Sequence, residues 1–174
     1  GLPTRDNAKT FIYAFLYGAG DEKIGEIVGQ GKGAGRKLKK SFLKKTPAIK
    51  KLRESVANTV KKRGFLYGLD KRKLKVRSEH SALNLLLQSA GALVMKKALV
   101  ILDERLQAKG FIPGTDYEFV ANIHDEWQID CRPEIAETIG ECGREAIKAA
   151  GDYFKFRCPL DGEYKIGNNW AETH

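Results

Sequence analysis

The sequence predicts an α+β fold in which a helix-rich first part is followed by a small antiparallel sheet. Apolar residues recur at helical spacing through most of residues 5–64. A second helical pattern, apolar on most sides, runs from about 81 to 109 and predicts a central, largely buried helix. Residues 117–131 then alternate between apolar and polar on both sides of a charged triplet, which is typical of two antiparallel strands and their turn.

Capping residues and glycines divide the first part into helices. Thr4 is a suitable N-cap for a helix from about Arg5 to Tyr17. Asp21 can cap a short second helix, and a glycine-rich break over residues 29–35 separates it from a basic third helix. These signals predict short helices joined by glycine-containing turns.

Further signals set the boundaries in the rest of the chain. A threonine–proline pair at 46–47 starts a fourth helix as N-cap and first-turn proline, and Gly64 ends it. Residues 65–76 are predicted to form a small basic hairpin. An amphipathic helix is expected over 133–150, and one or two short strands in the tail, 152–174.

The net charge of +9 at pH 7 is high for a chain of 174 residues. Much of it lies between Lys32 and Lys75, where Lys and Arg recur with little acid between them. Such a field favours a polyanion, either nucleic acid or an anionic membrane surface. A solvated face that promotes solubility explains the same charges equally well.

A membrane is the weaker partner, and the cysteines favour a reducing compartment. The apolar runs 90–95 and 98–102 are interrupted by Lys96 and Lys97, far short of the roughly 20 residues of a membrane span. The three cysteines are odd in number and form no C-x-x-C pair. We therefore expect a cytoplasmic protein without a membrane partner.

Four side chains repeat every four residues along the first predicted helix: Arg5, Lys9, Tyr13 and Tyr17. At 3.6 residues per turn they form one slowly winding stripe about 18 Å long. A guanidinium and an ammonium group at a helix start suit a polyphosphate, and the two aromatic rings offer stacking surfaces for a base. From spacing alone, a solvated basic edge beside a tyrosine packed in the core is the simpler interpretation.

Two carboxylates adjoin in the charged triplet His124, Asp125 and Glu126. Adjacent carboxylates at a tight turn repel each other unless a cation lies near them, and their oxygen atoms suit Mg²⁺. The alternative is an ordinary polar turn, in which Asp is common.

A further polar set, His80, Asn84 and Gln88, has the same four-residue spacing on an otherwise apolar helix. Polar side chains on a buried helix need hydrogen-bond partners. Asn and Gln amides could donate to the acceptors that base pairs present in a minor groove. Polar contacts inside the protein would satisfy them equally well.

Together these sets resemble family A DNA polymerases. The segment from Arg5 to Gly18 is similar to the family's motif B, R-x-x-x-K-x-x-x-[FY]-x-x-x-Y-G, residues 124–126 to motif C, and residues 80–88 to the helix between them. Three stretches are closer to the replicative polymerases of podovirus-like phages: residues 1–9, 87–92 and 167–174. The resemblance covers essentially the whole chain, in order.

The resemblance implies a DNA-directed DNA polymerase, a nucleotidyltransferase that adds dNTPs to a primer 3′ end with two Mg²⁺ ions. Arg5 and Lys9 would contact the triphosphate, and Tyr13 would pack beside its sugar and allow a missing 3′-hydroxyl. Asp125 would be a catalytic metal ligand, with Glu126 in a supporting role and Lys9 as a further catalytic residue. The implied DNA contacts are Tyr17 at the templating base, His124 at the primer terminus, and His80, Asn84 and Gln88 at the minor groove, although many members have arginine in place of His80.

The resemblance also implies an architecture and a missing part. Residues 1–76 would be the fingers and 77–174 part of the antiparallel palm of a right-hand polymerase. The family's motif A, which carries a second metal-binding aspartate, and the thumb precede motif B. We therefore expect a C-terminal fragment that binds primer-template DNA and dNTPs but needs the upstream polymerase portion for synthesis. Its open sheet edge favours self-association, and residues 58–75 look shorter than in the phage relatives.

Two other functions compete with a polymerase. A non-catalytic DNA-binding module derived from a polymerase would keep the fold and the basic surface without the chemistry. A metal-dependent nuclease would use Asp125 and Glu126 but leaves the stripe on the first helix unexplained. If the chain is phage-encoded, each would act in the cytoplasm of a bacterial host.

Overall fold

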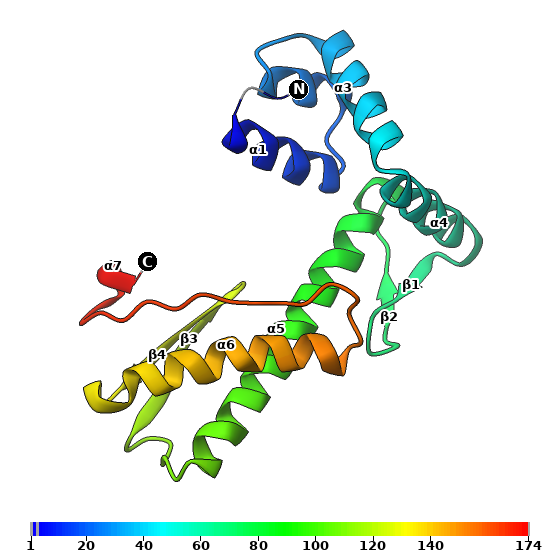
Figure 1. Ribbon diagram of the computed structural model, residues 1–174. Helices are drawn as coiled ribbons and strands as arrows, with labels where there is room; N and C mark the ends of the chain where they lie inside the picture. The colour runs from blue at the N-terminus through cyan, green and yellow to red at the C-terminus, as the bar shows by residue number, and fades with distance from the viewer. Residues whose placement is uncertain (1, 3, 174) are drawn as a thin grey trace. The chain divides into compact units, whose positions relative to one another are not determined.

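The computed structural model describes residues 2 and 4–173; Gly1, Pro3 and His174, which belong to the two ends of the family resemblance, lie outside the described part. Helices predominate, and the strands form two separate antiparallel pairs, β1–β2 and β3–β4 (Figure 1). This composition confirms the predicted α+β class.

The chain divides into two compact units, Gly1–Ser89 and Ala90–His174. The first contains α1 (Arg5–Leu16), α2 (Asp21–Ile27), α3 (Lys32–Lys45), α4 (Pro47–Arg63), β1 (Phe65–Tyr67), β2 (Lys73–Lys75) and η1 (Glu79–Ser81). The second contains β3 (Tyr117–Ile123), β4 (Glu126–Cys131), η2 (Pro133–Ile135), α6 (Ala136–Tyr153) and α7 (Trp170–Thr173). The division falls inside α5 (Ala82–Ala108), so this helix contributes to both units.

Charge is distributed unevenly between the two units. The first holds 21 Lys and Arg against 7 Asp and Glu, a net charge of +14. The second holds 10 Lys and Arg against 15 Asp and Glu, a net charge of −5. The excess of positive charge in the whole chain therefore belongs to the first unit alone.

Helix α1 begins as its capping residue predicts and buries one face. The Thr4 side chain accepts a hydrogen bond from the backbone N–H of Asn7 at 3.1 Å. Phe11 and Phe15 are buried and meet the ring of Phe42 on α3 at centroid distances of 5.2 and 5.0 Å, both edge-on. This aromatic cluster fixes which face of α1 points outward.

The expected glycine-rich break over residues 29–35 is shorter than predicted, because α3 already begins at Lys32 and includes Gly33 and Gly35. Gly35 is buried where α2 and α3 pack together: a Cβ there would lie 1.8 Å from the backbone oxygen of Asp21. Gly25 on α2 is equally confined, since its Cβ would lie 2.4 Å from the oxygen of Gly31. These glycines therefore serve close helix packing rather than a loop.

Asp21 does not cap α2 as predicted; Gly20 occupies the N-cap position and Asp21 is the first helical residue. Its carboxylate instead pairs with two cations of α3, Lys39 at 3.2 Å and Arg36 at 3.3 Å. Hydrogen bonds from Lys39 first, and then from Arg36, lower the pKa of Asp21 below its ordinary value. Asp21 thus ties α2 to α3 beside the glycine contact.

The predicted hairpin over residues 65–76 is confirmed. Gly64 ends α4 in the left-handed conformation (φ 73°), and Phe65 of β1 pairs with Lys75 of β2. Leu66 is buried in a small core with Val56 of α4 and with the first residues of α5. The second core of the first unit therefore joins α4, the hairpin and the start of α5.

The core of the second unit lies between α5, α6 and the β3–β4 pair. Buried residues of α5 recur every four positions and so form one stripe, which faces a matching stripe on α6: Val94, Ala98, Leu102 and Leu106 against Ile139, Cys142, Ala146 and Ala150. The expectation that α5 is largely buried was wrong, because its other faces are open; Val100, for example, is 49% exposed.

One helix in the described part of the chain, Glu79–Ala108, is long and apolar enough to cross a membrane, with a mean hydropathy of 1.7 over its most apolar window. Length and composition alone carry this result, and the core helix of a soluble protein has the same properties. Only 17% of that window is buried, and the buried residues of α5 in the second unit form the single stripe that faces α6.

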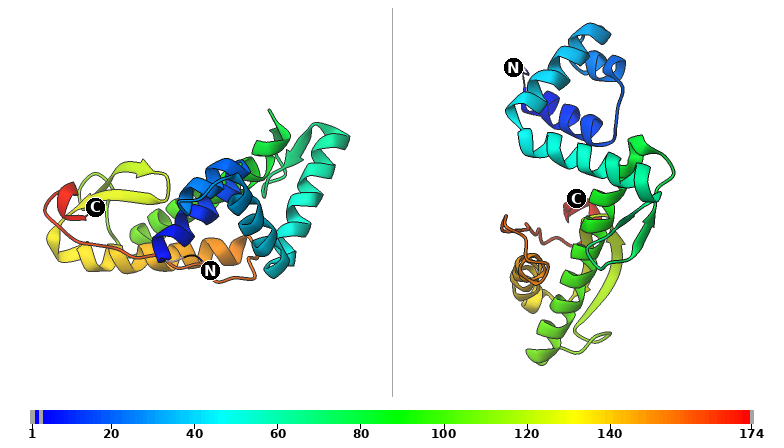
Figure 2. Two further views of the ribbon diagram at one scale, coloured as in Figure 1. Left: turned by 90° about the horizontal axis from the view of Figure 1, so that it is seen from above. Right: turned by 90° about the vertical axis from the view of Figure 1, so that its right-hand side faces the viewer.

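The strands expected in the tail are absent from its described residues, 154–173, which form an irregular segment and the short helix α7. Figures 1 and 2 show this segment running back along α6. Side chains hold it there: the ring of Tyr164 lies over Gly140, where a Cβ would be only 2.3 Å from the ring, and Leu160 lies against Gly151. The tail is therefore held by side-chain packing on α6 and not by pairing with a strand.

Tyr164→Phe is expected to loosen the tail and to change how stability responds to pH. The Tyr164 hydroxyl lies 2.7 Å from a carboxylate oxygen of Glu137 and 3.0 Å from one of Glu141, and these bonds raise its pKa from 10.0 to about 12. The proton is therefore held more tightly in the folded state, so the stabilisation is complete below pH 10 and is lost as the pH rises through about 12.

Urea unfolding at several pH values measures this effect. The wild type should have the higher midpoint at pH 8, and its advantage over the Tyr164→Phe variant should vanish at the alkaline end. Tyr153→Phe is the matched control, because Tyr153 is 62% exposed and its ring, rather than its hydroxyl, contacts Phe154 and Lys97. A constant difference at all pH values would contradict the assignment.

Candidate functional site

Helix α1 presents the predicted stripe on its exposed face. Tyr13 and Tyr17 are 58% and 54% exposed, and their rings stack at 6.4 Å with an interplanar angle of 19°. Arg5 and Lys9 are also exposed, and no acidic side chain among residues 2 and 4–173 forms an ion pair with either. Two uncompensated cations and two aromatic rings therefore share one surface, on the side away from Phe11 and Phe15.

The C-terminal end of α1 lies against the start of α5. The Tyr17 hydroxyl accepts a hydrogen bond from the Gln88 amide at 3.2 Å. Gly18, at φ 81°, approaches His80 so closely that a Cβ would lie 2.7 Å from the His80 carbonyl oxygen. Two of the predicted polar sets, 71 residues apart in the case of Tyr17 and Gln88, thus meet on one surface of the first unit.

The polar set on α5 differs in one detail from the prediction. His80 lies in the 3₁₀ turn η1 rather than in α5 itself. Asn84 is half-buried on α5, while His80 and Gln88 are exposed. A largely buried helix would have required internal partners for all three, whereas an exposed edge of α5 leaves His80 and Gln88 accessible to a ligand.

The charged triplet forms the turn between β3 and β4, as predicted. Ile123 pairs with Glu126 across a two-residue turn of His124 and Asp125, both exposed. His124 has a φ of 51°, a conformation that residues other than glycine adopt seldom and at some cost. The turn therefore holds Asp125 at its tip, with Glu126 as the first residue of β4.

Glu126 and Asp125 differ in how firmly they are held. Glu126 is half-buried and accepts a hydrogen bond from the side-chain amide of Gln128, which lies two residues along β4 on the same face. Within residues 2 and 4–173, no hydrogen bond or ion pair of the Asp125 side chain is found. Sequence reasoning did not identify Gln128, although its two-residue spacing from Glu126 on a strand was a usable signal.

The donor chemistry of the turn fits a hard cation only in part. Two adjacent carboxylates supply the oxygen ligands that Mg²⁺ prefers. No group of three or more His, Cys, Asp or Glu side chains in the described part of the chain could hold a metal ion. The turn can therefore provide two carboxylates of a site, and further ligands have to come from substrate, water or residues beyond this set.

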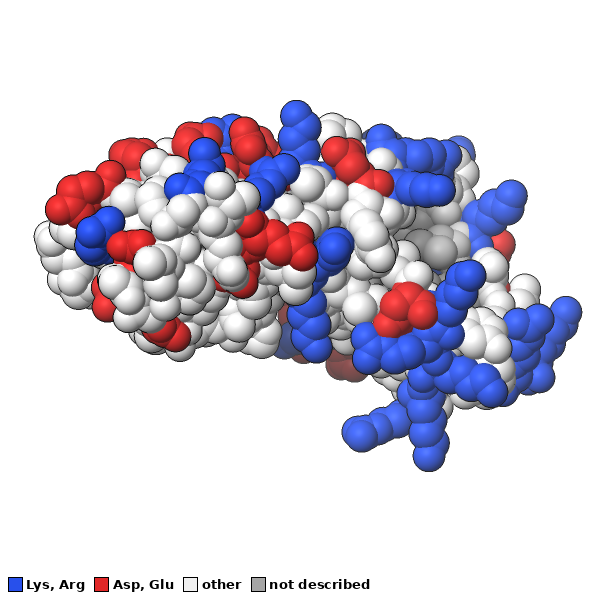
Figure 3. Space-filling model, turned by 90° about the horizontal axis from the view of Figure 1, so that it is seen from below, with Lys and Arg blue, Asp and Glu red and all other residues white. Residues whose placement is uncertain are grey.

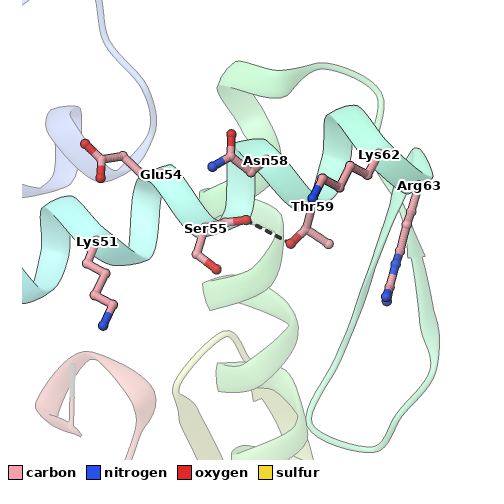
Figure 4. A pocket seen from close by; sticks show the side chains of 7 residues that line it. All are labelled: Lys51, Glu54, Ser55, Asn58, Thr59, Lys62 and Arg63. Carbon is pink, nitrogen blue, oxygen red and sulfur yellow. Dashed lines mark hydrogen bonds between the residues drawn. The ribbon is translucent and has the colours of Figure 1, made fainter.

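The positive charge of the first unit forms a surface of its own. In Figure 3, Lys and Arg side chains gather toward the side on which α4, β1 and β2 lie in Figure 1. A shallow hollow of about 510 Å³ follows one stretch of α4 (Figure 4) and is lined by Lys51, Glu54, Ser55, Asn58, Thr59, Lys62 and Arg63. Cations beside hydroxyl and amide groups suit a phosphate chain, which agrees with the polyanion predicted from composition.

Comparisons with known proteins agree with these features. The family model described as DNA polymerase family A matches residues 3–172. The chain is 53% identical to the DNA-directed DNA polymerases of Enterobacteria phage T3 and Escherichia phage T7, over 99% of this chain and 27% of each relative. It is 40% identical to that of Escherichia phage Phieco32, over 100% of this chain and 29% of the relative. The chain therefore spans little more than a quarter of the length of these relatives.

The two phage alignments extend over 190 positions, more than the 174 residues of this chain, so both relatives contain residues that it lacks within the matched stretch. Among solved structures, the fold is similar to the POL domain of Pol1 from M. smegmatis in complex with DNA primer-template and dNTP. The TM-score is 0.73 at 16% identity, over 84% of this chain and 27% of that one. The likeness supports the fold, and the family match over nearly every residue identifies the chain: it belongs to DNA polymerase family A.

Proposed function

We propose that this chain supplies the nucleotide-binding helix and part of the metal site of a DNA-directed DNA polymerase. The reaction is template-directed addition of dNTPs to a primer 3′ end. The observation that carries the proposal is the exposed face of α1, where Arg5 and Lys9 have no acidic partner in the described chain and two tyrosine rings continue the same surface. Family membership over residues 3–172 supports it.

Each residue of the stripe has a role that its chemistry supports. The Arg5 guanidinium binds phosphate oxygens as a bidentate donor, and the Lys9 ammonium adds a point charge one turn away. The dipole of α1 favours the same anionic group near the helix start. Tyr13 packs beside the nucleotide sugar, and Tyr17 stacks near the templating base.

DNA contacts follow from the neighbouring polar set. The side chains of His80, Asn84 and Gln88 face the minor groove of the new base pair. Hydrogen-bond acceptors lie there whichever strand carries the purine. The hydrogen bond between Gln88 and Tyr17 supports this assignment, because it joins the side chain proposed for the groove to the one proposed for the templating base. His124 lies at the primer terminus.

The metal site is shared with another part of the polymerase. Asp125 and Glu126 would hold Mg²⁺, which would supply Lewis-acid stabilisation of the charge on the phosphate. In-line transfer with two metals also needs the second aspartate of the family's motif A, which is not among residues 1–174. Residues 1–76 then serve as fingers and 77–174 as part of the palm, in the cytoplasm and without a membrane partner.

Lys9→Ala should weaken dNTP binding by about tenfold or more, because a hydrogen bond to a charged group contributes about 1.5–3 kcal/mol. Affinity for duplex DNA should stay nearly unchanged. Isothermal titration of dNTP into the chain in the presence of primer-template DNA measures the first quantity, and fluorescence anisotropy of labelled duplex measures the second.

Lys40→Ala is the matched control, since Lys40 is an exposed lysine of α3 in the same positively charged unit. It should leave dNTP binding unchanged. Equal losses in both variants would mean that the general field of the unit, and not the face of α1, attracts the nucleotide.

A further inference from the structure

We propose that the C-terminal helix α7 holds the Glu126 carboxylate in place through Gln128, which makes Thr173 and Gln128 positioning residues of the metal site. The inference deepens the proposed function and rests on it, because it assigns a support to one of the two carboxylates of the motif C turn. Gln128 lies outside the residue sets that the sequence patterns single out, and Thr173 enters there only as part of the stretch 167–174 that carries the family resemblance.

The Gln128 amide links the tail to the turn, because its nitrogen bonds to Glu126 and its oxygen to Thr173. Its Nε2 donates a hydrogen bond to Glu126, and its Oε1 accepts one from the Thr173 hydroxyl at 3.3 Å. All three side chains are half-buried. Because an amide has its donor and its acceptor at opposite ends, a bond from Thr173 orients the amide so that the donor points at Glu126.

A local network of hydrogen bonds stabilises α7. A single helical turn is not stable by itself, so its partners matter. The Glu172 carboxylate accepts hydrogen bonds from the Asn168 backbone N–H at 2.8 Å and from the Asn169 amide at 2.9 Å. In return, Asn169 accepts a bond from the Glu172 backbone N–H at 3.2 Å. Glu172 thus closes the turn that carries Thr173.

The Thr173 hydroxyl has a second acceptor within reach, the Trp170 carbonyl oxygen at 3.2 Å. One hydroxyl proton serves one acceptor at a time, so the bond to Gln128 competes with a bond inside α7. Loss of the hydroxyl therefore removes a link to β4, while the fold of α7 keeps the bonds made by Glu172.

Support of this kind matters for a metal site. Partners that hydrogen-bond a ligating carboxylate set its orientation, and their loss typically lowers metal affinity or activity by about 10–100-fold. Gln128 is such a partner for Glu126, whereas Asp125 depends on the geometry of the hairpin turn. Thr173 contacts Gln128 and not Glu126 itself, so its effect should be smaller. Removing its hydroxyl is expected to lower metal affinity about fivefold, equivalent to one neutral hydrogen bond of about 1 kcal/mol.

The first experiment tests the network without metal or DNA. Thr173→Val removes the hydroxyl at nearly constant shape, and Thr173→Ser keeps it. In ¹⁵N–¹H NMR spectra of the metal-free chain, Thr173→Val should shift the side-chain amide signals of Gln128 and speed their exchange with water, while Thr173→Ser should resemble the wild type. Identical Gln128 signals in all three proteins would overturn the proposal.

The second experiment tests the consequence for Mg²⁺. In a chimera in which this chain replaces the matching segment of the phage T7 relative, Thr173→Val should raise the Mg²⁺ concentration for half-maximal primer extension about fivefold. Gln128→Leu should raise it about tenfold or more. Both variants should bind primer-template DNA as the wild type does, and Thr173→Ser should restore the wild-type Mg²⁺ requirement.

The two experiments separate failure of the inference from failure of the proposed function. A wild-type chimera that extends no primer contradicts the proposed function, and the NMR comparison still decides whether α7 holds Glu126 through Gln128. An active chimera whose Mg²⁺ requirement is the same in Thr173→Val and Gln128→Leu as in the wild type overturns the positioning role.

Discussion

Replacing Gly35 by alanine is expected to lower the free energy of unfolding of the chain by about 3 kcal/mol, at the upper end of the usual cost of overpacking. The added Cβ would lie 1.8 Å from the Asp21 carbonyl oxygen and 2.7 Å from the Gly25 backbone nitrogen. Both are backbone atoms of α2, so no flexible side chain can move aside to make room. Helices α2 and α3 would have to separate, which also breaks the ion pairs of Asp21 with α3.

Gly33→Ala is the matched control for this variant. Gly33 lies on the same helix, and a Cβ there would meet no atom within 4 Å. Alanine in place of a helical glycine should stabilise the chain by about 0.5–1 kcal/mol. Urea unfolding followed by circular dichroism measures both variants. Similar effects of the two substitutions would contradict the close packing described for α2 and α3.

Asp125→Asn is expected to reduce primer extension by about 10³-fold or more, since a metal ion contributes several kcal/mol to stabilising the transition state and each 1.36 kcal/mol corresponds to a factor of ten. Asparagine keeps the size of the side chain and removes its charge. Asp125 is exposed at the turn tip and contacts no described partner, so folding should be unaffected. Single-turnover extension by the phage T7 chimera measures the rate.

Asp130→Asn supplies the control on the same hairpin. Asp130 is also an exposed carboxylate of β4 and lies opposite Glu118 in the register. Its replacement should leave extension, primer-template binding and the unfolding midpoint unchanged. Comparable loss of extension in both variants would show that the total negative charge of the hairpin matters, and not a ligand at position 125.

The sequence predicted the elements whose boundaries depend on local chemistry. Thr4 as N-cap, the proline at 47 and the left-handed Gly64 each set a helix end within a residue or so of its observed position. The strand pair around the charged triplet was also predicted, because alternation is a local pattern. Features that depend on distant contacts were not: Gly35 looked like a loop residue because α2 cannot be seen to pack against it from the sequence alone.

The tail and the faces of α5 show the same limit. One or two short strands were expected in the tail, but the side chains of Leu160 and Tyr164 pack on α6 instead. A helical pattern that is apolar on most sides predicted a largely buried helix, whereas only the stripe that includes Leu102 is covered in the second unit. In both cases the partner surface, and not the segment itself, decides the outcome.

In the candidate site, too, local spacing was predictable from the sequence and contacts between distant residues were not. Four-residue spacing placed Arg5 to Tyr17 on one face of α1, and the structure leaves that face exposed. The contact between Tyr17 and Gln88 joins residues 71 positions apart, which a single sequence does not reveal. The link from Gln128 to Thr173 spans 45 positions and was missed for the same reason, whereas the two-residue spacing of Gln128 and Glu126 on one strand was a usable signal.

Mg²⁺-dependent primer extension tests the central claim most directly: that this chain carries the nucleotide-binding helix and part of the metal site of a polymerase. Three samples are needed: this chain alone, the phage T7 relative without its matching segment, and the chimera of the two. Extension by the chimera alone is the predicted result, because only the chimera combines the stripe of α1 and Asp125 with the motif A aspartate. A folded chimera that binds primer-template DNA but extends no primer would contradict the claim and favour a non-catalytic DNA-binding module.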